Sequence, residues 1–241
     1  TKSRFMLVSG DDRHVICFGT ETTIADSSTQ DNMFLRWSGQ DDQNVWTPTA
    51  TNTAGSKRLV DGNVIQTAVR SRGAVLIWTD TALYQMQFIG PPLTFGFNQL
   101  GSACGCIGLH AAVDVGGVSF WMGTDSFFLF DGAVQKIPCT VQDYVFDDLN
   151  QNAKQDIFCA ANTDFNEVMW FYPSLNSTQI DRMVVFNYAE NLWYVGTLAR
   201  SAWADRGTYD NPYAAEFEAS DTTATISTIT GLKAGRTFIY L

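Results

Sequence analysis

Short apolar segments alternate with polar turns along almost the whole chain. The segments are rich in β-branched and aromatic residues, and clusters of Gly, Asp, Asn and Ser separate them, as expected of strands joined by tight turns. Hairpin tips are expected at Arg72-Gly73, Gly116-Gly117 and Asp131-Gly132. The expected strands are 5–8, 14–19, 33–38, 64–69, 74–79, 82–88, 109–115, 117–122, 126–131, 156–161, 167–172, 182–188 and 192–197.

Two patterns recur along the chain. In the first, an apolar strand, a polar loop and a second apolar strand lead to the triplet Asn-x-Trp, once at Trp46 and again at Trp193. In the second, an apolar strand ends in Trp and a shorter apolar strand follows, at Trp78 and at Trp121. Repeats of roughly 40 to 50 residues built from short strands are typical of a β-propeller or another radial β array.

We therefore predict an all-β fold, a β-propeller-like array of short antiparallel blades with at least four blades in this chain. The blades are expected at 5–48, 62–98, 108–139 and 156–198, with further strands over 200–241. We expect 1–241 to be a single propeller-type domain and a fragment of a longer protein. A pair of β-sandwiches has a similar strand count and is the alternative fold, although it gives no reason for the long repeat.

One helix is expected near 140–150, between the third and fourth blades. Thr140 and Asp143 have the spacing of a capping box, and an apolar face follows. That face consists of Val141, Tyr144, Val145 and Leu149. The segment 91–107 lacks strand alternation, so we predict a long loop between blades, of the kind that often carries function or contacts between subunits.

Composition and charge narrow the function classes. With 45% apolar residues the chain can bury a core, and it holds no apolar run of about 18 residues that could cross a membrane. The net charge is −10, with the acids spread through the loops, and no basic stripe suited to gripping nucleic acid is present. Five cysteines without framework spacing predict buried, reduced thiols of a protein made in a cytosol.

The candidates for chemistry each have a simpler structural explanation. His14 and His110 lie in or beside expected strands, and the sequence shows no serine nucleophile motif for them to serve. They are therefore expected to be structural. Cys104-x-Cys106 lacks the second ligand pair of a zinc site. The segment Gly101–Gly108 lacks the Gly-Lys-Ser/Thr of a phosphate loop.

Two acidic patterns also have simpler structural explanations. Asp148-x-Asn150-x-Asn152 begins like a calcium loop but departs from it at the later positions, so a helix exit is expected. Asp164 and Glu167 flank an expected turn and do not form an evident carboxylate pair for glycoside hydrolysis. We therefore expect no catalytic, cofactor-binding or metal-binding residue, and no enzyme activity.

The two Asn-x-Trp tryptophans have two interpretations. Trp46 and Trp193 each follow a polar turn and are expected to start the last strand of a blade, where they would anchor blade packing. A platform on which sugars stack is the alternative.

Four segments resemble tail proteins of double-stranded DNA bacteriophages. They are 118–132, 137–146, 165–174 and 182–200. The family they resemble is the propeller-containing tail nozzle or hub, similar to tail tubular protein B, or its relatives in head-to-tail stabilisation. This family has no catalytic motif to transfer.

The resemblance implies a structural virion protein, a subunit of a ring, commonly of six copies, around the channel for genome ejection. It also implies contacts with adaptor or portal-side and tail-fibre proteins, location in the phage tail after synthesis in the host cytoplasm, and passage of double-stranded DNA without sequence-specific binding. No membrane insertion by this segment is expected. An acidic surface is compatible with a channel that must not hold its cargo.

Two other function classes remain open at this point. The aromatic content and acidic loops also suit a carbohydrate-binding or polysaccharide-degrading propeller module. A generic intracellular propeller used for protein–protein contact is the third.

Overall fold

The computed structural model describes residues 2–10, 12–205, 212–215 and 238–240, and it confirms the all-β fold class. Four sheets have four antiparallel strands each and a fifth has three. Sheet one is β1 (Phe5–Val8), β2 (Val15–Phe18), β3 (Phe34–Trp37) and β4 (Gly55–Arg58). Sheet two is β5 (Ile65–Ser71), β6 (Ala74–Thr79), β7 (Ala82–Gly90) and β8 (Thr94–Ser102).

Sheets three to five follow the same order. Sheet three is β9 (Ala112–Val115), β10 (Val118–Met122), β11 (Phe127–Phe130) and β12 (Val134–Ile137). Sheet four is β13 (Phe158–Asn162), β14 (Glu167–Tyr172), β15 (Arg182–Asn187) and β16 (Leu192–Gly196). Sheet five is β17 (Ala202–Ala204), β18 (Tyr213–Ala215) and β19 (Phe238–Tyr240).

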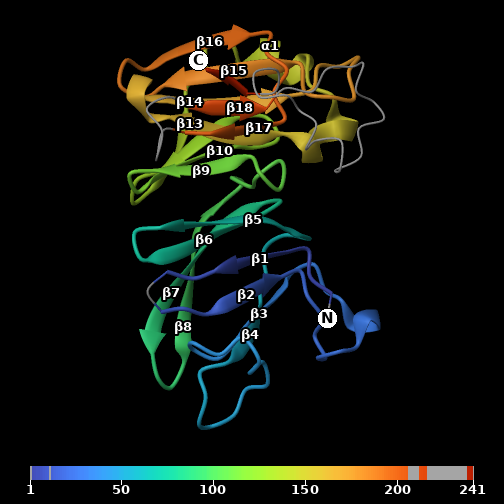
Figure 1. The fold of residues 1–241 in the computed structure, drawn as a ribbon, viewed down its shortest axis with the longest axis vertical. Helices are drawn as coiled ribbons and strands as arrows, with labels where there is room; N and C mark the ends of the chain where they lie inside the picture. The colour runs from blue at the N-terminus through green and yellow to red at the C-terminus, as the bar shows by residue number, and fades with distance from the viewer. Residues whose placement is uncertain (1, 11, 206–211, 216–237, 241) are drawn as a thin grey trace.

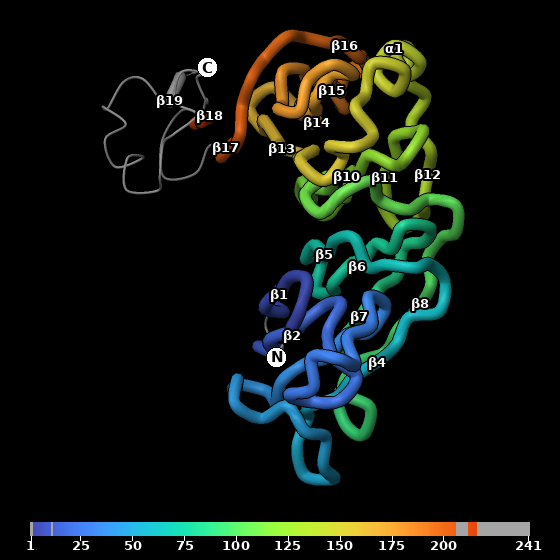
Figure 2. The backbone as a smooth tube through the Cα atoms, turned by 90° about the vertical axis from the view of Figure 1, so that its right-hand side faces the viewer, coloured from blue at the N-terminus to red at the C-terminus, as the bar shows by residue number. Residues whose placement is uncertain are grey.

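The first four sheets stack face to face in chain order (Figure 1). Within each sheet the strands pair in sequence order, so each sheet is a simple meander. The first strands of successive sheets are neighbours: β5 contacts β9, β9 contacts β13, and β13 contacts β17. A parallel bridge between His110 and Phe158 shows that the third and fourth sheets start in the same direction. The sheets are thus arranged as propeller blades are, along a curved path (Figure 2).

This topology gives the array two distinct ends. Because each four-stranded meander starts and finishes at the same end, every link between sheets lies at one end, together with the turn between each second and third strand. We call this the connection end. The hairpins that join first to second and third to fourth strands lie at the other end, the hairpin end. Arg72 and Gly73, at one of these tips, have φ values of 45° and 76°, as a tight hairpin turn requires.

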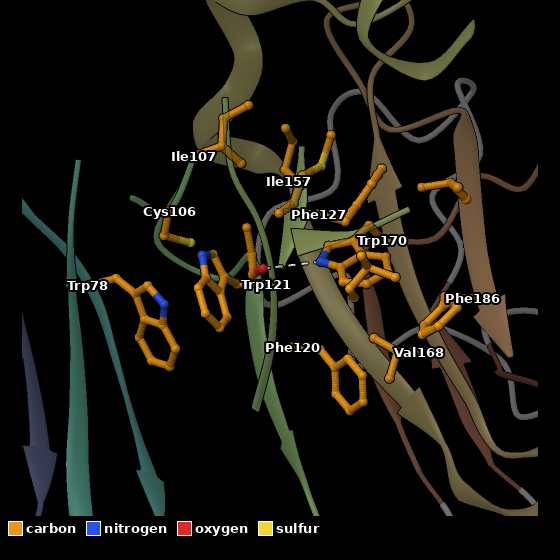
Figure 3. Packing of buried hydrophobic residues seen from close by; sticks show 14 of the residues in the cluster. Trp78, Cys106, Ile107, Phe120, Trp121, Phe127, Ile157, Val168, Trp170 and Phe186 are labelled. Atoms are coloured by element: carbon orange, nitrogen blue, oxygen red, sulfur yellow. Dashed lines mark hydrogen bonds between the residues drawn. The ribbon is translucent and has the colours of Figure 1, made fainter. Parts of the chain in front are cut away.

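Three tryptophans occupy corresponding places in the array. Trp78, Trp121 and Trp170 lie in the second strands of sheets two, three and four, and each is fully buried (Figure 3). The rings of Trp78 and Trp121 meet edge to face, with centroids 5.4 Å apart. The second pattern of the sequence therefore marks a true structural repeat, which also includes Trp170.

The link between sheets two and three packs into the same core. Trp121 Nε1 donates to the carbonyl of Cys104 at 2.8 Å, and Trp170 Nε1 donates to that of Ala111 at 3.2 Å. Gly105 lies so close to the turn after β6 that an added Cβ would stand 2.1 Å from the backbone oxygen of Asp80. We call the three tryptophans and residues 103–111 the buried seam.

The prediction of a loop over 91–107 is wrong. Residues 94–102 form β8, which with β7 makes a long hairpin whose far half packs on sheet one: Phe95 contacts Trp37 with ring centroids 5.3 Å apart. Cys104, Cys106 and Ile107 are buried and serve the core. The segment looked irregular because its polar and glycine positions belong to an outer strand, which little else covers.

The outer strands explain the other differences from the predicted blades. β4, β8 and β12 were all missed, and sheet one extends to Arg58, beyond the predicted limit of 48. Trp46 does not start a strand: it lies in the loop between β3 and β4, where its Nε1 donates to the carbonyl of Gln43 at 2.7 Å. Trp193 does lie in the last strand of its sheet, as predicted. The Asn-x-Trp triplet therefore does not mark equivalent positions.

The connecting helix is present as α1 (Gln142–Asp147). Its predicted cap is not formed, since the residue before the helix is Val141 and no side chain caps it. Val145 is buried as predicted, but Tyr144 is 54% exposed. Short 3-10 helices cover Ser27–Thr29, Gln151–Asp156 and Thr163–Phe165.

Candidate functional site

His14 lies fully buried at the hairpin end of sheet one. Its Nδ1 is 3.2 Å from Asp12 Oδ2, and its Nε2 is 3.1 Å from Thr53 Oγ1. The ring packs edge to face on Phe95 at 5.0 Å. The Asp-His-Thr order is that of a nucleophilic relay, but Thr53 Oγ1 also accepts from Gln40 N–H at 2.8 Å. This network ties the loop between β3 and β4 to the β1–β2 hairpin, in keeping with the structural role expected of His14.

The cysteine pair is also part of the core. Cys106 donates from Sγ to the carbonyl of Gly108 at 3.3 Å, and burial raises its pKa to about 12. Cys104 is buried, and burial raises its pKa too. All five cysteines are free, three of them buried and two half-buried. A protonated, enclosed thiol is a poor nucleophile and metal ligand.

The two acidic patterns are engaged in local structure. Asn150 accepts from Asn152 N–H at 3.0 Å and so caps Gln151–Asp156, while Asp148 pairs with Arg182 at 3.3 Å. Glu167 accepts from Tyr194 Oη and, at 3.0 Å, from Asn162 Nδ2.

The turn predicted around Asp164 is present in the structure. Asp164 lies in the turn before β14, where the next-but-one residue Asn166 has a φ of 58°, so the predicted turn is confirmed. No group of three or more His, Cys, Asp or Glu side chains placed to hold a metal ion occurs in the described part of the chain.

His110 differs from His14 because it is exposed and lines a cavity at the connection end. The cavity has a volume of about 570 Å³ and lies where β13 begins, beside the β14–β15 turn and the segment that leads to β17. Its polar lining residues include Gln155, Asp156, Gln179 and Arg200, and Phe158 contributes an aromatic wall.

A second feature is the outer edge of sheet four. β16 is the last strand of its sheet, yet it carries exposed apolar residues on both faces. Leu192 is 56% exposed, Tyr194 42% and Val195 37%. Val195 shares a groove of about 460 Å³ with the exposed Tyr144 of α1. We call these four side chains the outer edge.

Trp193 holds this strand in place from its inner face. Its ring lies 4.7 Å from Phe127 and 4.6 Å from Phe186, and its Nε1 donates to the carbonyl of Pro138 at 2.8 Å. Trp193 is therefore a packing anchor, as predicted, and β16 is a fixed platform for its exposed neighbours.

The two ends of the array differ in charge. Across sheets one to four, the described connections at the hairpin end contain six acids and two bases. The links and turns at the connection end contain eleven acids and two bases, Lys154 and Arg200, and two further bases, Lys2 and Arg4, precede β1 at the same end. The eleven acids are Glu21, Asp26, Asp31, Asp61, Asp80, Asp125, Asp143, Asp147, Asp148, Asp156 and Asp181.

Comparison with known proteins gives no family. No family model matches the chain, and no curated protein matches it. A solved chain from an S. cerevisiae complex, a dbp5 variant bound to nup159, a gle1 variant, IP6 and ADP, is similar at 8% identity with a TM-score of 0.43. The match covers 91% of this chain and 54% of that chain, so this chain spans about half of its length. A likeness this distant carries no argument about function.

Sequence reasoning missed both the cavity and the outer edge. Gln155, Gln179 and Arg200 come from three separate connections, and nothing in their local sequence sets them apart. Leu192 and Tyr194 were recognised as strand residues, but their exposure follows from the position of β16 at the end of its sheet. Among the described helices, none has the length and apolar character to cross a bilayer.

Proposed function

We propose that this chain is a structural virion protein, a subunit of a ring-shaped tail nozzle or hub of a double-stranded DNA bacteriophage. The observation that supports assembly into a ring is the exposed outer edge. An edge strand offers unpaired backbone groups, and exposed apolar side chains beside them favour contact with another chain. The occupant we propose is a second copy of this chain.

The position of the outer edge suits a ring. A contact between unlike surfaces of identical subunits closes into a ring when the rotation allows it. The outer edge lies on one side of sheet four, so it would meet a different surface of the next copy. Natural proteins protect an edge strand that must stay free with charge or proline, and β16 has neither.

The segments that resemble phage tail proteins support the same proposal. They include β10, β11, most of α1, β14, β15 and β16, and so include the outer edge itself. The resemblance to phage tail proteins therefore includes the outer edge, the surface at which we propose that a second copy binds.

The charge of the connection end fits a genome channel. A protein that neutralises phosphates releases counterions and holds DNA tightly, which a conduit must avoid. With eleven acids against four bases, the connection end would repel a duplex at short range. We propose that this end, repeated around the ring, faces the passing DNA.

Cryo-electron microscopy of the full-length protein tests the proposal. The expected result is a closed ring in which β16 and α1 of each copy lie against the next copy. A protein that stays monomeric at high concentration and is absent from purified phage particles would overturn it.

A further inference from the structure

The cavity at the connection end brings together four parts of the chain. His110 comes from the link before sheet three, Gln155 and Asp156 from the link before sheet four, and Gln179 from the β14–β15 turn. Arg200, from the link before β17, is 5% exposed and donates from Nη1 to the carbonyl of Ala199 at 2.7 Å. The volume of the cavity, about 570 Å³, falls within the roughly 300–1,000 Å³ typical of small-molecule sites.

Four polar side chains of this cavity form no bond within the described part of the chain. Among the described residues, no hydrogen bond or ion pair is formed by the side chains of His110, Gln155, Asp156 or Gln179. These four side chains are exposed and lie on one concave surface, so their polar groups are available to a ligand.

Other acids at the same end behave differently. Asp61 accepts from Thr81 Oγ1 at 2.9 Å and from Gln99 Nε2 at 2.8 Å. Asp181 accepts from the backbone N–H and the hydroxyl of Ser174, both at 2.7 Å. Compared with these structural carboxylates, Asp156 is free to bind something from outside the described chain.

The chemistry of the lining selects the class of ligand. Carboxamide and carboxylate groups are planar and can each bond two adjacent hydroxyls of a sugar ring. Phe158 stacks one ring face on Phe171, with centroids 4.7 Å apart, and its other face can contact the C–H face of a sugar. One carboxylate and one guanidinium give the lining no net charge, and the acids around it disfavour an anion.

We propose that this cavity binds a neutral saccharide of one or two rings. Gln155, Asp156 and Gln179 hydrogen-bond its hydroxyls, and Phe158 packs against its apolar face. The site is a second function beside ring assembly and does not depend on it, because no side chain of the outer edge lines the cavity.

Binding is tested with the full-length protein and defined sugars. The probes are lactose, maltose, cellobiose and N,N′-diacetylchitobiose, with 3′-sialyllactose and digalacturonate as charged comparators, measured by saturation-transfer NMR and calorimetry. The expected result is that at least one neutral disaccharide binds and the charged sugars bind more weakly. Failure of all four neutral sugars to bind at millimolar concentration, or preference for a charged one, overturns the proposal.

Variants place the binding in this cavity. Gln155→Ala and Gln179→Ala should each weaken binding about five- to tenfold, the loss of one ligand hydrogen bond. Gln87→Ala, the same change at an exposed position of β7, should leave the affinity unchanged. If the cavity variants bind as tightly as the wild type, the sugar lies elsewhere and the proposal is wrong.

The outer edge provides the test of independence. Leu192→Lys should leave sugar binding unchanged whether or not it disrupts the ring. A variant that loses the ring and keeps the sugar therefore separates the two proposals, and loss of the sugar with the ring would contradict their independence.

Discussion

The buried seam and the outer edge are both rich in large apolar side chains, but only the outer edge is exposed. Trp121 and Trp170 are enclosed between sheets, and their indole N–H groups have backbone partners. Leu192 and Tyr194 lie on β16, whose inner face is packed against the protein and whose outer face is exposed to solvent. The difference teaches that the same kind of residue can build the fold in one place and prepare a contact in the other.

The comparison predicts opposite responses to mutation. Changes in the buried seam should lower the free energy of unfolding, and changes in the outer edge should weaken assembly without unfolding the chain. Each experiment below can break that separation.

The largest effect is expected from Trp170→Ala. Emptying a fully buried indole site should cost about 3–5 kcal/mol of unfolding free energy, measured by urea denaturation. Trp46→Ala, the same change in a surface loop, should cost less than about 1 kcal/mol. Similar losses in the two variants would contradict the different roles of the two tryptophans.

Gly105→Ala should be the next most damaging change. The added methyl would meet the backbone of Asp80 and Thr81, so the link between sheets two and three must shift. Such overpacking costs about 1–3 kcal/mol. Gly10→Ala is the control, because nothing lies within 4 Å of the added atom. Equal stability of the two variants would show that the link is not tightly packed.

Leu192→Lys should act on assembly. A charge placed at a central apolar contact costs about 2 kcal/mol or more, so the dissociation constant between subunits should rise at least about 30-fold. The melting temperature of the separated subunit should stay the same. Leu93→Lys changes an exposed leucine far from β16 and should assemble normally. Sedimentation velocity measures both, and unchanged assembly of Leu192→Lys would place the contact elsewhere.

The seam should also show in the pH dependence of stability, with the smallest effect. Burial raises the pKa of the Cys106 thiol from 9.0 to about 12. Above pH 9 the unfolded chain loses this proton while the native chain keeps it, so stability falls as the pH rises towards 12. Between pH 8 and 10 the loss from this thiol is about 1 kcal/mol.

Cys106→Ala tests that assignment. Urea unfolding at pH 8 and pH 10 should show a smaller fall for the variant than for the wild type. The same fall in both would mean that Cys106 exchanges its proton as freely in the folded state as in the unfolded one.

The sequence identified the inner strands because their burial leaves a clear pattern. β6, with the sequence Ala74–Thr79, and β14, with Glu167–Tyr172, are buried on both faces or nearly so, and their predicted limits are correct. β4 and β12 contain Lys57 and Lys136 and are mostly exposed, so they lack the apolar signal on which the prediction relied.

The candidate sites could not be predicted in the same way. Trp46 and Trp193 share a local triplet and are both half-buried. Trp193 packs on Phe127 and Phe186, whereas Trp46 bonds within its own loop, and this difference depends on what the rest of the chain places beside each ring. The cavity needs Gln155, Gln179 and Arg200 to meet across three connections, and that meeting follows only from the stacking of the sheets. The lack of a catalytic motif could be recognised in the sequence, and this polar cluster could not.

Hydrogen–deuterium exchange at low and high protein concentration tests the central claim most directly. The amides of residues 103–111 in the buried seam should be equally protected at both concentrations. Those amides of β16 that do not pair with β15 should exchange quickly at low concentration and slowly once subunits assemble. If β16 exchanges at the same rate at both concentrations while the protein assembles, the outer edge is not the contact between subunits.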